Sequence, residues 1–203
     1  MRGHIVRLFS DAPPAPKRVS RSFAALDAGT PPRFQTGVLA GQARKVIDVP
    51  VGFNTRAIVW LAPEKRGGFC SLLEIDRPDR ARPDGVGGEC TPLMDRLSVG
   101  TSLNGRISPT GEILSGPVLL DGWVGLPKAD SLELRFQDGT AAVIPLVWVS
   151  SPISGGFFVY SIPPLHWRVG HLPTQLTVRS AEAKELAHAA VSGIDLRAAY
   201  AQP

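Results

Sequence analysis

The chain has 203 residues, of which 43% are hydrophobic and 20% charged, so it is able to bury a core as one large or two small domains. Its formal net charge of +4 is uneven, because residues 1–66 carry 11 Lys or Arg against 4 Asp or Glu. The basic residues stand singly or in pairs without interleaved aromatic residues. This pattern argues against a nucleic-acid partner and favours ordinary surface charge, with proximity to an anionic membrane surface as the alternative.

No apolar run approaches the ~18 residues that span a bilayer, and the N-terminus lacks the apolar segment of a signal peptide. We therefore expect the chain as written to be soluble.

The N-terminal part is predicted to be an arm that carries one short helix. Residues 11–16 are rich in proline and indicate an extended spacer. Val19, Phe23 and Leu26 then recur at helical spacing, which predicts a helix over residues 18–26, before a Gly-Thr-Pro-Pro stop. We interpret this helix as a lid on the core, with a partner-binding helix as the alternative.

From about residue 44 onward the apolar residues are spaced as in strands. The 21 glycines and 19 prolines are typical of short strands joined by tight turns. Strands are predicted at residues 57–61, 69–75, 97–103, 117–120, 132–136, 155–162 and 175–179. We predict a mainly β fold, an antiparallel β-sandwich of Ig-like or related type with one or two units. The expected division is an arm with its helix (1–35), a first β unit (36–105) and a second β unit (106–203), which can pack as one domain.

An Asp-Gly dipeptide between two apolar segments predicts a β-hairpin with a two-residue loop. That loop would pair Phe136 with Ala141 and Leu134 with Val143, so that apolar residues meet on one face. Pro145 should then confine the second strand to an edge or an end of its sheet.

The only two cysteines, Cys70 and Cys90, follow glycine pairs and flank a charged, proline-rich excursion. Their spacing without an intervening histidine matches neither a zinc knuckle nor a C-x-x-C redox motif. A disulfide is the leading interpretation, and two reduced, buried thiols are the alternative. The segment of residues 85–88 reads as a glycine-rich turn that leads Cys90 back towards Cys70.

We predict no catalytic, cofactor-binding or metal site. Ser154 lacks the leading glycine of a nucleophile elbow, and no phosphate-binding glycine motif is present. His166 and His171 share a proline-bounded loop, where they could bind a metal only with carboxylates from elsewhere, so we interpret them as loop histidines. Trp167 in the same loop is most simply folded back over the end of the fold. The alternative makes His166, Trp167 and Arg168 contacts for a protein or glycan partner.

The motifs GGFCSLLEI, GGEC, LSVGTSL, PVLLDGWVG, SLELRFQDGT and PISGGFFVYSIPP, in this order, resemble a group of uncharacterised actinobacterial proteins over most of residues 5–190. Members of that group usually carry one N-terminal membrane-spanning helix just before a segment like RLFSDAPPAPKRVSRSF, and this chain departs by starting after that point. The resemblance implies an anchored or exported domain. It also implies that residues 185–191 form a strand, whereas their composition alone suits a helix equally well.

The expected function is that of a non-catalytic interaction or structural β-domain of the cell envelope. The alternative is a hydrolase whose site is assembled from distant residues. The resemblance favours an extracytoplasmic or membrane-associated location, whereas the start as written favours the cytoplasm.

Overall fold

The computed structural model describes residues 4–29, 37–77, 84–91, 97–103, 106–107, 113–167 and 170–191. Over these residues the fold is mainly β, as predicted, with one α-helix. The helical elements are η1 (Phe9–Asp11), α1 (Lys17–Gly29), η3 (Ala40–Gln42) and η4 (Pro164–Trp167). The strands are β1 (His4–Arg7), β2 (Arg44–Gly52), β3 (Thr55–Pro63), β4 (Phe69–Asp76), β5 (Asp84–Thr91), β6 (Leu97–Leu103), β7 (Arg106–Ile107), β8 (Ile113–Ser115), β9 (Val118–Val124), β10 (Ser131–Phe136), β11 (Ala141–Ile144), β12 (Leu146–Val149), β13 (Gly155–Ile162), β14 (Pro173–Arg179) and β15 (Glu185–Ala190). Within these ranges no helix has the length and apolar character needed to cross a membrane.

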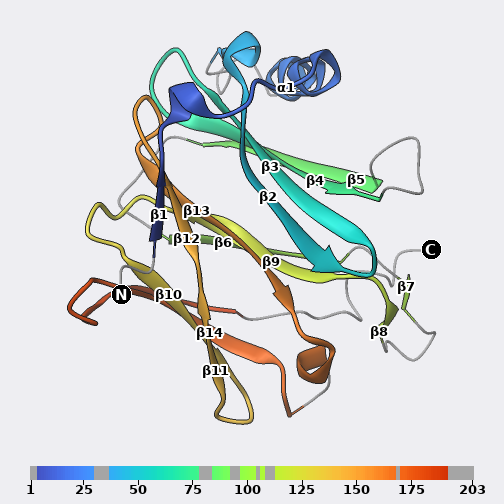
Figure 1. Ribbon diagram of the computed structural model, residues 1–203, viewed down its shortest axis with the longest axis vertical. Coiled ribbons are helices and arrows are strands. Elements are labelled where there is room, and N and C mark those ends of the chain that lie inside the picture. Colours follow the sequence, from blue (N-terminus) through green and yellow to red (C-terminus); the bar gives the residue numbers. More distant parts are fainter. Residues whose placement is uncertain are drawn as a thin grey trace.

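The strands form three larger sheets, which lie one above another beneath α1 (Figure 1). The upper sheet has the order β2-β3-β4-β5, the central sheet β1-β12-β13-β9-β6 and the lower sheet β11-β10-β14-β15, while β7 pairs with β8. Among the described residues, all strand pairs are antiparallel except β1 with β12. Strands β1 and β6, which precede residue 106, thus belong to a sheet that is otherwise built from later parts of the chain. The division into an arm and two β units stays a prediction.

Apolar side chains fill each gap between the layers, because every strand that lies between two layers presents apolar residues to both of them. Between α1 and the upper sheet lie Val19, Phe23, Ala43, Ile58, Trp60, Ala62 and Leu72. Between the upper and central sheets lie Phe9, Val46, Ile47, Val59, Leu61, Phe69, Trp123, Val149, Ile153 and Phe157. Between the central and lower sheets lie Val118, Leu120, Leu132, Leu134, Ile144, Phe158, Ile162, Leu176 and Val178.

The predicted register of the β10–β11 hairpin is wrong by one residue. Leu134 lies opposite Ala142, and Glu133 opposite Val143. The loop has three residues, because Phe136 N donates to Thr140 O and Gly139 takes a φ of 83°. A turn that ends in a left-handed glycine adds one residue to the loop and shifts all later pairs. Val143 is consequently 70% exposed.

The turn-like interpretation of residues 85–88 is also wrong, because these residues belong to β5 and pair with β4. Gly88 lies opposite Leu72, and an added Cβ would lie 2.3 Å from Leu72 Cδ2 and 2.8 Å from Ser71 O. The glycine therefore lets β5 pack closely on its neighbour. At the C-terminal end, residues 185–190 form strand β15, paired with β14, after a turn in which Ala183 has a φ of 61°.

An ion pair fixes α1 to the upper sheet. Arg18 Nη1 and Nη2 donate to Glu74 Oε2 and Oε1 at 2.7 and 2.6 Å, and Glu74 is 1% exposed. We expect Arg18→Ala to lower the free energy of unfolding by about 1–3 kcal/mol, because it leaves a buried carboxylate without these two donors. Urea unfolding measures the change. Arg21→Ala, on the exposed side of the same helix, is the matched control, and equal losses in both variants would contradict the prediction.

Candidate functional site

The two cysteines form a disulfide, which confirms the leading interpretation. Cys70 on β4 lies directly opposite Cys90 on β5, and their Cα atoms are 3.9 Å apart. Cys70 is fully buried and packs in the layer beneath α1. The Glu64 carboxylate lies 3.4 Å from Cys70 Sγ, but both sulfur atoms are bonded to each other and offer no thiolate to a metal. The disulfide therefore acts as a structural link.

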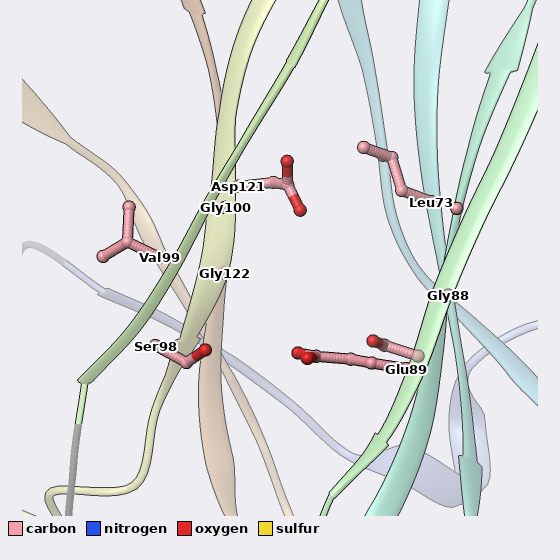
Figure 2. Close-up of a pocket in the computed structure, with 10 residues that line it drawn as sticks. Leu73, Gly88, Glu89, Ser98, Val99, Gly100, Asp121 and Gly122 are labelled. Carbon is pink, nitrogen blue, oxygen red and sulfur yellow. The ribbon is translucent and has the colours of Figure 1, made fainter. Parts of the chain in front are cut away.

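A cleft of about 290 Å³ opens between the upper sheet and the central sheet. Strands β4 and β5 form one wall, and strands β6 and β9 form the other (Figure 2). It is lined by Ser71, Leu73, Gly87, Gly88, Glu89, Ser98, Val99, Gly100, Asp121 and Gly122. We name this feature the β5–β6 cleft.

The alternation of side chains along β5 places the Glu89 carboxylate in this cleft. A Cβ at Gly88 would face Leu72 and Leu26, on the α1 side of the upper sheet. Because successive residues of a strand point to opposite faces, Gly87 and Glu89 face the central sheet. A Cβ at Gly87 would meet no atom within 4 Å, so the cleft is open at this position.

The cleft combines carboxylates with exposed backbone. The side chains of Glu89 and Asp121 both point into the space between the two walls (Figure 2). Strands β5 and β6 each stand at the end of their sheet's strand order, so one edge of each has no neighbouring strand among the described residues. The cleft therefore offers an extended ligand two strand edges, with the Glu89 carboxylate on one wall.

A second cluster joins the β10–β11 loop to the loop before β14. The Oδ2 atom of Asp138 lies 2.8 Å from His171 Nδ1 and 3.8 Å from His166 Nδ1. We name these three residues the histidine cluster. Hydrogen bonds from the Thr140 side chain and from His171 lower the pKa of Asp138 well below its usual range, so it is a carboxylate. Among the described residues, neither imidazole has a hydroxyl or thiol hydrogen-bonded to it.

Two of the predicted contact residues in the same loop, Trp167 and His166, are partly buried against other parts of the chain. The Trp167 indole N–H donates to Ile162 O at 2.8 Å, and its ring stacks on Phe53 with centroids 5.9 Å apart. The side chain is half-buried and thus folds back over the end of the core. The His166 ring is stacked on Phe136, with centroids 3.7 Å apart. Arg168 lies outside the described residues, and contact of these residues with a partner stays a prediction.

Searches against protein-family models, curated proteins and solved structures find no match to this chain. Sequence reasoning missed Glu89, Asp121 and Asp138. Asp138 had a local signal only as a turn residue, and nothing in the sequence indicated that this turn faces His166 and His171. Glu89 and Asp121 are single carboxylates in separate strands, with no spacing that connects them.

Proposed function

We propose that this protein is a non-catalytic interaction domain of the cell envelope, and that its β5–β6 cleft holds an extended, basic segment of a partner polypeptide. The observation that carries the proposal is the cleft, which lies beside the edge strands β5 and β6 and into which Glu89 points from the β5 wall. The Cys70–Cys90 disulfide supports the location, because such bonds persist in oxidising compartments. We also propose that the stacked sheets are a β-sandwich of Ig-like or related type.

Two physical features favour a polypeptide as the ligand. An edge strand has backbone N–H and C=O groups that an added strand can pair with, whatever its side chains. Gly87 and Gly100 have no side chain to extend into the cleft, so the backbone of β5 and of β6 is uncovered there. The Glu89 carboxylate on the β5 wall then favours a lysine or arginine of the added segment, because opposite charges attract.

Selection from a displayed library of random peptides tests this function. We expect the selected peptides to be enriched in lysine and arginine, and their binding to weaken with added salt. Glu89→Gln should weaken binding by about tenfold, since a hydrogen bond to a charged group is worth about 1.5 kcal/mol or more. The Glu185→Gln variant, which changes an exposed carboxylate on β15, should bind normally.

A variant that fills the cleft tests whether the selected peptides bind there and not at another surface of the protein. Gly87→Phe fills open space that faces the central sheet, so we expect a folded protein that no longer binds the selected peptides. Gly41→Phe is the matched control, because a Cβ at Gly41 also meets no atom within 4 Å and Gly41 does not line the cleft. Peptides that bind Gly87→Phe as well as the unchanged protein would refute the proposal.

The hydrolase alternative has one observation in its favour, the contact between Asp138 and His171. An aspartate that orients a histidine is part of many hydrolytic sites. Turnover of ester or peptide substrates that is lost in Asp138→Asn, with peptide binding in the cleft unchanged, would favour this alternative.

A further inference from the structure

We propose that the histidine cluster is a binding site for a divalent transition-metal ion of the zinc class, held by Asp138, His166 and His171. One potential ligand atom from each of the three residues lies within 4.8 Å of the other two. Two imidazole nitrogens with one carboxylate oxygen are a donor set that suits Zn²⁺. This proposal is independent of the function assigned to the β5–β6 cleft.

Asp138 is held in position by contacts that involve neither histidine. Its Oδ1 atom accepts hydrogen bonds from Thr140 N at 2.9 Å and from Thr140 Oγ1 at 2.6 Å. The other oxygen, Oδ2, is the atom that faces both imidazoles. The carboxylate therefore presents one oxygen to an ion, while the other is fixed by the turn, as is common for the carboxylate ligands of metal sites.

The histidine loop is tied to the same turn through the neighbouring glutamine. Gln137 Oε1 accepts hydrogen bonds from Gly170 N at 2.8 Å and from Leu172 N at 3.2 Å, and Gln137 N donates to Leu172 O at 2.9 Å. These bonds bracket His171, so its position relative to Asp138 is set by the backbone. The stack of His166 on Phe136 fixes the plane of the second imidazole.

Coordination requires one rearrangement of protons. In the structure, Nδ1 of His171 contacts the Asp138 carboxylate, and Nδ1 of His166 contacts His171 O at 3.0 Å. When Nδ1 carries the ring proton, it donates to these oxygens. In the other neutral tautomer the proton is on Nε2, and the lone pair of Nδ1 is available to an ion. Binding therefore replaces these two hydrogen bonds.

The solvent exposure of the three side chains and their nitrogen and oxygen ligand atoms indicate which ions the site can bind. The side chains of His166, Asp138 and His171 are 12%, 18% and 40% exposed, so an ion can enter from solvent and complete its coordination with water. Mg²⁺ and Ca²⁺ prefer sites made of oxygen ligands alone, which this cluster is not. The other described group of potential ligands, Glu64 with Cys70 and Cys90, has its sulfur atoms in the disulfide.

Calorimetric titration of the untagged protein with ZnCl₂ tests the proposal. We expect saturable binding of one ion, with no comparable heat from MgCl₂ or CaCl₂. Asp138→Asn and His171→Ala should each weaken Zn²⁺ binding by about tenfold or more, because each removes one of the three proposed ligands. Loss of a group that only supports a metal ligand already has an effect of about this size. The matched control is His188→Ala, which removes an exposed histidine that contacts Glu185 on β15.

Two further measurements distinguish the loss of a metal ligand from the loss of folding and show which residues bind the ion. Circular dichroism without metal should show that Asp138→Asn is folded, and Zn²⁺ should raise the thermal midpoint of the unchanged protein and of His188→Ala but not of Asp138→Asn. Long-range ¹H–¹⁵N spectra should show Zn²⁺ shifting the Nδ1 resonances of His166 and His171. Absence of binding at millimolar Zn²⁺, equal binding by Asp138→Asn, or loss of binding in His188→Ala would overturn the proposal.

Discussion

Replacing both Cys70 and Cys90 by alanine is expected to lower the free energy of unfolding by about 3 kcal/mol. The bond joins residues 20 apart in the sequence, and a crosslink that closes a loop of this length restricts the unfolded chain by about that amount. Denaturant unfolding of the oxidised protein and of the double variant measures the difference.

Reduction provides the control for this prediction. Added dithiothreitol should destabilise the unchanged protein by nearly the same amount and leave the double variant unaffected, because the variant has no disulfide to reduce. Intact-mass analysis after alkylation should detect two thiols with reductant and none without it. If reduction leaves the unfolding midpoint of the unchanged protein where it was, the bond is not a stabilising link.

Replacing Phe69 by alanine is expected to lower the free energy of unfolding by about 3–5 kcal/mol. Phe69 extends from β4 into the gap between the upper and central sheets and is fully buried there. Its ring meets Trp123 and Phe157 of the central sheet edge to face, with centroids 5.5 and 5.0 Å apart. The variant loses apolar burial and both aromatic contacts, and it leaves a cavity between two rigid layers that cannot close around it.

The same substitution at an exposed phenylalanine serves as the control for the packing effect. Phe53 is 52% exposed and stacks on Trp167, so Phe53→Ala should reduce the stability by about 1 kcal/mol or less. If Phe69→Ala fails to fold, Phe69→Leu keeps most of the apolar volume and should still unfold at lower urea concentration than the unchanged protein. Equal stabilities of Phe69→Ala and Phe53→Ala would show that the contact between the sheets contributes little.

The sequence by itself determined the class of structure and the position of most elements. Strong local patterns carry this information, because alternation of apolar residues requires only that one face of a strand be buried. The predicted strands at residues 97–103 and 155–162 agree with β6 and β13, and the predicted helix lies within α1. The disulfide could also be predicted from the sequence. The two cysteines follow glycine pairs, flank a charged, proline-rich segment and match no common metal or redox motif.

Only the tertiary structure decided which strands are neighbours and which polar groups converge. A strand's own pattern does not specify its partner, so neither the parallel pairing of β1 with β12 nor the membership of β6 in the central sheet could be predicted. The hairpin register depended on the conformation of Gly139, and one residue of difference exposed Val143.

Both candidate sites arise in the same way. Glu89 and Asp121 share the cleft because the upper sheet is stacked on the central one. Asp138 reaches His166 and His171 because β10 pairs with β14 and brings their loops to one end of the lower sheet. In both sites, stacking or pairing of strands brings together residues that are far apart along the chain, and no local spacing of residues encodes this.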